Sequence, residues 1–184
     1  MTKSQLIEKV YRCIDETYPD TTTQDLEEFN IPAFLEEAIR WVAKSVPTTA
    51  LGKGESSGSL TSIPNFLRLI ELKMKDWNTS VTDALSQSNP KYWQQQNPAL
   101  RGGKSRPVAF LVKGETELEA YPNGEIKTLQ YFKMPTTDAD YAKFPDKLLD
   151  ITAWKTAELV FSMMQDANGV SVAQAQITSI LPTL

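Results

Sequence analysis

The sequence contains no histidine and only one cysteine, Cys13. Without histidine, the common zinc sites and the Ser–His and Cys–His nucleophile pairs lose a member, and the usual general base near neutral pH is missing. A single cysteine forms no disulfide within the chain, and its position among the apolar residues of a predicted helix indicates a buried thiol. We therefore expect a protein that is not an enzyme, has no catalytic residues and binds no metal or cofactor.

The sequence also lacks an excess of positive charge and a long apolar run. Its 19 Lys and Arg residues are mixed with 23 Asp and Glu, for a net charge of -4, whereas binding to nucleic-acid phosphates depends on a basic surface. No stretch approaches the roughly 18 apolar residues that a membrane span needs, so we expect no membrane contact. Apolar residues make up 41% of the 184 residues, a slightly low share that favours burial against a partner.

Two glycine-containing stretches are similar to nucleotide-binding loops but do not meet their requirements. Residues 97–105 end in Gly-Lys-Ser, yet Pro98 stands where a phosphate-binding loop needs its first glycine, and proline has no amide hydrogen to donate. The glycines at 52, 54 and 58 are spaced one residue off a dinucleotide fingerprint, and no strand precedes them. We interpret both stretches as loops.

The carboxylates give no clear catalytic or metal-binding pattern. Asp138 and Asp140 are two residues apart, but the further oxygen ligands and the glycine spacing of a calcium loop are missing. We interpret this pair as part of a loop.

Apolar residues recur at helical spacing in several parts of the chain. Residues 3–18 predict an amphipathic helix, and a second helix begins after Asn30 as N-cap and ends before Pro47. The longest helix spans about 145–168, and its apolar residues cover more than one face, which is typical of a central helix. Residues 171–181 are compatible with one more helix or with a tail.

Three β-rich runs between residues 107 and 135 predict a three-stranded antiparallel meander. Asn123-Gly124 lies between two of them, and Asn-Gly between alternating runs is a strong hairpin signal. Leu118 and Ala120 alternate with glutamates, so one face of the meander is covered and the other is exposed to water.

These elements predict an α+β fold that is mainly α, a helical bundle with an inserted three-stranded antiparallel β-meander and long loops, in one domain of residues 1–184. Residues 63–77 read as a short helix or a strand, and their state is left open. The expected parts are a helical core at 3–47, 63–77 and 145–168, the meander at 107–135, loops at 48–62 and 78–106, and a C-terminal arm at 170–184.

Candidate interface residues lie in the second loop and in the C-terminal arm. Tyr92 and Trp93 form an aromatic pair in a polar stretch, which either anchors the loop on the core or is a hot spot for a partner. We favour the core and keep the partner contact as the alternative. The apolar chain end favours docking. The candidate interface residues are Tyr92, Trp93, Val170, Val172, Ile177, Ile180, Leu181 and Leu184.

The order of these parts also carries a family resemblance. A helix with the sequence FLEEAIRWVAKSVP at 34–47 precedes a loop, the strand region ends in YPNGEIKTLQYFKMP at 121–135, and a long apolar helix follows at 148–164. This arrangement resembles the head-to-tail connector adaptor proteins of tailed bacteriophages, also called head completion or ring proteins.

The resemblance implies a structural virion protein that forms a ring, usually of twelve copies, on the portal protein. Such a ring forms part of the DNA channel and of the platform for tail attachment, and residues 170–184 would reach the portal. The implied partners are further copies of the chain, the portal protein and further tail or ring proteins, while DNA passes without sequence-specific binding. The implied location is the virion, after assembly in the bacterial host cytoplasm.

Two alternatives remain open at this stage. One is another phage structural component, such as a tail-tube completion protein, and the other is a non-viral protein-binding module.

Overall fold

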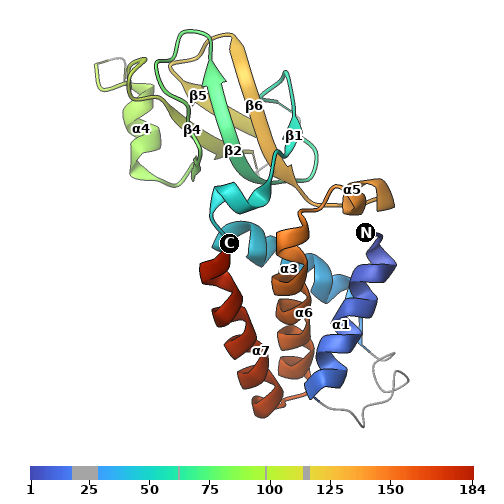
Figure 1. Cartoon of the computed structure of the whole chain (residues 1–184). Coiled ribbons are helices and arrows are strands. Elements are labelled where there is room, and N and C mark those ends of the chain that lie inside the picture. Colours follow the sequence, from blue (N-terminus) through green and yellow to red (C-terminus); the bar gives the residue numbers. More distant parts are fainter. Residues whose placement is uncertain (18–28, 62, 98, 114–116) are drawn as a thin grey trace. The chain divides into compact units, whose positions relative to one another are not determined.

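The chain folds into two compact units, one helical and one rich in strands. The computed structural model describes residues 1–17, 29–61, 63–97, 99–113 and 117–184. The helical unit comprises residues 1–52 and 134–184, and the β unit comprises residues 53–133 (Figure 1). The chain is about 48% helical, with six helices and two three-stranded sheets among the described residues, so the predicted α+β class is confirmed. The sequence suggested one domain, whereas the structure has the β unit inserted between two halves of the helical unit.

The helical unit is built around α6 (Leu149–Met163), which packs against α1, α3 and α7. Buried residues occur on several sides of α6, and even Thr152 and Thr156 are fully buried there. Their hydroxyls donate hydrogen bonds to the carbonyls of Leu148 and Thr152, so both of these buried hydroxyls have a partner. The other elements of this unit are α1 (Lys3–Thr17), α3 (Ile31–Ser45), α5 (Asp138–Ala142), α7 (Ala167–Ile180) and the 3₁₀ turns Thr48–Leu51, Asp146–Leu148 and Leu181–Thr183.

The local signals of the first two predicted helices agree with the structure. The side chain of Asn30 accepts a hydrogen bond from the backbone N–H of Ala33 over 3.2 Å, which makes Asn30 the N-cap of α3. This helix ends at Ser45, before Pro47. The first helix is described from Lys3 to Thr17, and its expected last residue, Tyr18, lies outside the described residues.

The end of the long C-terminal helix was predicted wrongly. The expected stop at residues 168–169 is the first turn of α7, and the break comes earlier, at Gln165, whose φ is 58°. The side chain of Asp166 then accepts a hydrogen bond from the N–H of Asn168 over 3.1 Å and starts α7. Residues 170–180 are therefore a helix packed on α6 rather than an arm, which confirms the helical alternative for 171–181.

The described residues of the β unit form six strands in two sheets. One sheet has the strand order β1-β6-β2 and the other β3-β4-β5, where β3 and β4 run parallel and the remaining pairs run antiparallel. The state of residues 63–77, left open between helix and strand, is a strand over residues 66–74, which form β2, so this segment does not belong to a helical core. The predicted loops at 48–62 and 78–106 contain short elements. The strands and the helix of this unit are β1 (Glu55–Ser56), β2 (Phe66–Met74), β3 (Ala84–Ser86), α4 (Pro90–Gln96), β4 (Val108–Val112), β5 (Glu117–Tyr121) and β6 (Ile126–Lys133).

The three strands of the predicted meander exist, but they do not form one sheet. The hairpin of β4 and β5 is confirmed, with Val108 opposite Tyr121. The third strand, β6, instead pairs with β2 and β1 in the other sheet. The connection between β5 and β6 is held against the segment after β2. The N–H of Lys75 donates to the carbonyl of Glu125 over 2.8 Å, and the indole of Trp77 donates to the carbonyl of Pro122 over 2.9 Å.

Both sheets contribute to one apolar core. Its members are Leu69, Leu72, Met74, Leu129 and Tyr131 from the first sheet, and Ala109, Leu118 and Ala120 from the second, together with Ile63 and Trp77. Backbone hydrogen bonds also cover two strand edges, because Leu72 pairs with Val81 and the N–H of Leu118 donates to the carbonyl of Leu60. These contacts pair some of the backbone groups at these two edges, which would otherwise be open to unwanted strand addition.

Candidate functional site

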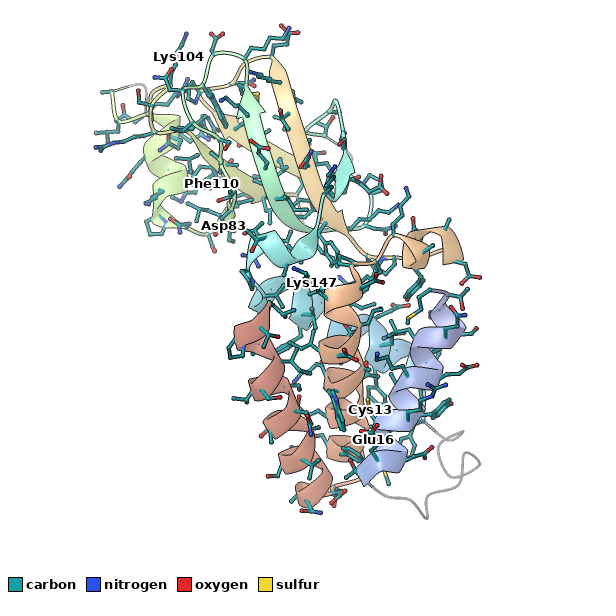
Figure 2. All side chains as sticks on the ribbon, in the orientation of Figure 1. Cys13, Glu16, Asp83, Lys104, Phe110 and Lys147 are labelled. Carbon is teal, nitrogen blue, oxygen red and sulfur yellow. The ribbon has the colours of Figure 1, made fainter. Side chains whose placement is uncertain are left out.

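The candidate site of the β unit is built on the short helix α4. Asn89 is the N-cap of α4, and its side chain accepts a hydrogen bond from the N–H of Lys91 over 3.0 Å. Pro90 occupies the first turn. The ring of Tyr92 packs edge-to-face on Phe110, with ring centroids 5.3 Å apart. Because Phe110 and Val112 alternate with the core residue Ala109 along β4, α4 covers the face of this sheet that points away from the main core. Phe110 is labelled among the side chains in Figure 2.

A polar network fastens α4 to β5. The carboxylate of Glu119 accepts hydrogen bonds from the hydroxyls of Tyr92, over 3.1 Å, and Tyr121, over 2.9 Å. The side chain of Gln96 donates to the Tyr121 hydroxyl over 2.8 Å. Burial, and then the hydrogen bond to Glu119, raise the pKa of both tyrosines. Both hydroxyls therefore stay protonated and act as donors to the carboxylate near neutral pH.

The turn after α4 is held by Gln95, which is buried. Its side-chain oxygen accepts from the N–H of Gly102 over 2.7 Å, and its backbone carbonyl accepts from the guanidinium of Arg101 over 2.9 Å. The guanidinium of Arg101 also lies over the ring of Tyr121, 5.6 Å from its centroid. The glycine-rich stretch is thus a folded turn with its own internal contacts.

The Gly-Lys-Ser residues of this turn contact the segment after β2. The ammonium of Lys104 forms an ion pair with Asp76 at 3.0 Å, and the hydroxyl of Ser105 accepts from the side chain of Asn78 at 3.0 Å. These contacts are those of a loop packed on its neighbour, as the sequence suggested. Pro98, on which the sequence argument against a phosphate loop rests, lies outside the described residues.

Of the aromatic pair Tyr92 and Trp93, one residue anchors the loop on the core and the other is exposed. Tyr92 is only 7% exposed and anchors α4, whereas Trp93 is 71% exposed. Leu100, in the turn after α4, is also 63% exposed, and the sequence analysis did not single it out. Its only sequence signal is an isolated large apolar residue in a polar stretch. Exposed Trp and Leu side chains on a folded loop are typical of an interaction surface.

The C-terminal candidate residues differ in accessibility. Ile177 is 5% exposed and packs in the core of the helical unit. The other five, Val170, Val172, Ile180, Leu181 and Leu184, are half-buried. Residues 167–184 contain no charged side chain, and depletion of charge is a property of the buried centres of protein interfaces.

Two groups of ionisable residues outside α4, the Asp138–Asp140 pair and Cys13, have structural roles. Asp140 completes a capping box with Thr137 at the start of α5, so Asp138 and Asp140 lie in a short helix and the interpretation of this pair as part of a loop was wrong. Cys13 and Glu16 lie on α1 (Figure 2), and burial, followed by the charge of Glu16, raises the pKa of the Cys13 thiol to about 12. Within the described ranges, no group of three potential ligands from His, Cys, Asp and Glu is placed to hold a metal ion.

No helix in the described part of the chain has the length and apolar character needed to cross a bilayer.

Comparison with known proteins identifies the family. No curated protein sequence matches the chain at a significant level. A family model described as SU10 adaptor protein matches residues 1–184, the whole of the sequence. The predicted resemblance is thereby confirmed, and the chain belongs to the SU10 adaptor protein family, a family of phage head–tail adaptors.

Proposed function

We propose that this chain is a virion protein that assembles as a ring on the portal protein, and that the ring forms part of the DNA channel and of the tail attachment platform. The observation that carries the proposal is the family match over the complete sequence. A structural adaptor needs surfaces for neighbours rather than an active site. Twelve copies per ring is the number that the resemblance suggests.

The C-terminal helix supplies the surface proposed to face the portal. Five apolar residues of this helix and of the turn after it are half-buried, and residues 167–184 contain no charged side chain. A stretch without charge is poorly suited to a purely solvated face and well suited to the centre of an interface. Because α7 packs on α6 through Ala173 and Ile177, this surface is rigid rather than a free tail.

The net negative charge of the chain is consistent with a channel that lets DNA pass without binding it tightly. The net charge of -4 is of the same sign as the phosphates, so a ring of such subunits would not hold passing DNA tightly. A contact between two different surfaces of neighbouring copies, repeated around an axis, closes a ring without any catalytic group.

The test is the mass of the purified protein by light scattering, alone and then mixed with the portal protein of the same phage. We expect a species of low mass alone and a ring-sized increase in mass on the portal. A stable oligomer that ignores the portal would contradict the proposal. Association with a tail protein instead of the portal would place the chain in another layer of the head–tail connection and would also contradict it.

A further inference from the structure

The two units carry charges of opposite sign. The β unit has eleven Lys and Arg against eight Asp and Glu, whereas the helical unit has eight against fifteen. The separation is also visible in two segments. Residues 84–114 contain five basic residues and no acidic one, and residues 13–39 contain eight acidic residues and no basic one. Although the net charge of the whole chain is modest, its basic and acidic residues are therefore unevenly distributed between the two units and are not evenly mixed as the sequence suggested.

The basic segment includes the exposed apolar residues next to α4. We define the α4 patch as Lys91, Trp93, Leu100 and Arg106. All four side chains are exposed, and within the described ranges neither Lys91 nor Arg106 has an ion-pair partner. The other three cations of the basic segment are already engaged, since Arg101 lies on Tyr121, Lys104 pairs with Asp76 and Lys113 pairs with Glu117.

The α4 patch is held rigidly before any partner arrives. Tyr92 and Gln95 point into the β unit and fix the helix and its turn, while Trp93 stays exposed with its ring edge-to-face on Tyr92, at a centroid distance of 5.7 Å. Trp and Arg are the residues most enriched among interface hot spots, and a fixed surface loses little conformational freedom on binding. These are the properties of a binding surface for a partner with acidic and apolar groups.

We propose that the α4 patch binds the acidic helical unit of a second copy of this chain, at the end of α1. There Asp15 and Glu16 are exposed, and neither has an ion-pair partner in the described part of the chain. Each copy carries one basic and one acidic surface, so every contact pairs unlike surfaces and like surfaces repel. Such a contact repeats from copy to copy and closes a ring when the rotation between neighbours divides a full turn. The inference rests on the proposed ring function and names the surfaces that form it.

Charge counting favours a protein partner over DNA. Only two cations of the patch are free to meet phosphates, whereas tight backbone binding uses many phosphate contacts. An exposed Leu100 gains nothing from a phosphate, but it can be buried against another protein.

A zero-length carbodiimide cross-link between copies tests the proposed contact. Equal amounts of ¹⁴N- and ¹⁵N-labelled protein are mixed at high concentration and low salt, so a link between copies appears as a mixed-isotope peptide pair. We expect a mixed-isotope link between Lys91 and Asp15 or Glu16. Absence of mixed-isotope links, or their presence only at other lysines, would overturn the inference.

Charge-reversal variants provide the second test. We expect K91E/R106E and D15K/E16K each to weaken self-association in sedimentation by about tenfold, because a favourable pairing becomes repulsive. The chain that carries all four substitutions has both surfaces inverted, and its association should return toward that of the original protein. The matched control K53E/K127E changes the charge of exposed residues of the β unit by the same amount and should associate normally. Failure of the four-fold variant to recover, with an unchanged melting temperature, would contradict the inference.

The outcomes separate this inference from the proposed function. Equal capture of the original protein and of K91E/R106E into a ring on the portal would leave the function standing and refute the α4 contact. Lys91 cross-links and charge-swap recovery without any association with the portal would support the contact and refute the function. Salt-sensitive binding of duplex DNA that requires Lys91 and Arg106, without cross-links between copies, would assign the patch to nucleic acid and refute the inference.

Discussion

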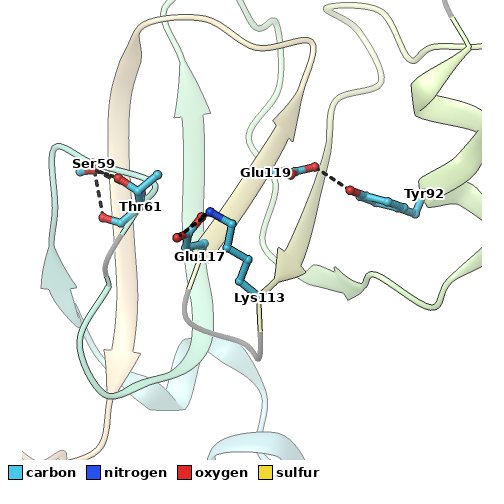
Figure 3. Close-up of polar contacts among 6 residues, drawn as sticks. All are labelled: Ser59, Thr61, Tyr92, Lys113, Glu117 and Glu119. Atoms are coloured by element: carbon cyan, nitrogen blue, oxygen red, sulfur yellow. Dashed lines mark hydrogen bonds and ion pairs between the residues drawn. The ribbon is translucent and has the colours of Figure 1, made fainter.

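The hydroxyl of Tyr92 on α4 donates a 3.1 Å hydrogen bond to the carboxylate of Glu119 on β5 (Figure 3). The two residues are 27 positions apart in the sequence, and this bond, with the packing of Tyr92 on Phe110, fixes the helix on its sheet. The orientation of exposed Trp93 therefore depends on a contact made by its buried neighbour.

Removing this hydrogen bond should loosen α4 measurably. We expect Tyr92→Phe to lower the free energy of unfolding by about 1 kcal/mol, and Glu119→Ala by about 2 kcal/mol, because the carboxylate also accepts from Tyr121. Urea denaturation followed by circular dichroism measures both. The control Gln94→Ala changes an exposed residue of the same helix and should stay within about 0.5 kcal/mol. Equal stabilities for all three variants would contradict the role of the network.

Gly169 in the first turn of α7 should not tolerate a side chain. In most helical positions Gly→Ala stabilises by up to about 1 kcal/mol. Here a Cβ would lie 2.6 Å from Cγ of Phe161, a fully buried ring, and would also collide with the carboxylate of Asp166. We therefore expect Gly169→Ala to destabilise by roughly 1–3 kcal/mol in thermal denaturation.

The matched control for this prediction is Gly103→Ala. A Cβ at Gly103 meets no described atom within 4 Å, so this variant should melt at nearly the original temperature. A stabilised Gly169→Ala protein would show that α6 and α7 are packed less closely than the structure indicates.

The buried thiol of Cys13 should make stability depend on alkaline pH. Burial raises its pKa from 9.0 to about 12, so between these values the folded protein retains a proton that the unfolded chain loses. This contribution to stability is complete below pH 9 and is lost as the pH rises toward 12, by at most about 1.4 kcal/mol per pH unit.

The comparison of the original protein with Cys13→Ala isolates this effect. Below pH 9 the original protein should be more stable by a constant amount, because alanine leaves a small void. From pH 9 to 11 the difference should shrink in urea denaturation curves. Tyr141, whose pKa is also raised by burial to about 12, adds a pH dependence that both proteins share. Parallel curves for the two proteins would contradict a buried, protonated thiol.

Local signals account for the parts of the fold that the sequence predicted correctly. Asn30 followed by Pro32 marks a helix start through one side-chain hydrogen bond and one fixed φ angle, both within four residues. The β4–β5 hairpin follows from two short runs that are adjacent in sequence. The cap at Asp166 was just as local, but Asn168-Gly169 gave a competing stop signal, and packing of Gly169 on Phe161 decided in favour of a start.

Long-range pairing accounts for the parts that the sequence did not predict. The alternating pattern of β6 shows which side chains point inward, but both β5 and β2 could satisfy it, and β2 lies more than fifty residues earlier. The accessibility of the residues on α4 likewise depended on which structure the segment adopts. Tyr92 and Gln95 are three residues apart and face inward together once residues 90–96 form a helix, which leaves Trp93 outside.

A single charge at the chain end tests the proposed portal-facing surface. Leu184 is half-buried and lies beyond α7, so Leu184→Asp should fold normally and shift the melting temperature by only a few degrees. Capture on the portal should fall by about tenfold or more, because a carboxylate would be buried without a partner. Ile177 cannot serve this purpose, since it is buried against α6 and an acidic residue there would unfold the protein.

The matched control is Ser4→Asp, which adds the same charge to an exposed position in the first turn of α1, where a carboxylate is favourable. It should be captured as well as the original protein. Loss of capture in both variants would mean that added negative charge anywhere on the subunit repels the portal. Loss in Leu184→Asp alone would mean that the C-terminal surface without charged side chains makes the contact. Only at that surface would binding to the portal bury the added carboxylate without a partner, which would weaken binding strongly.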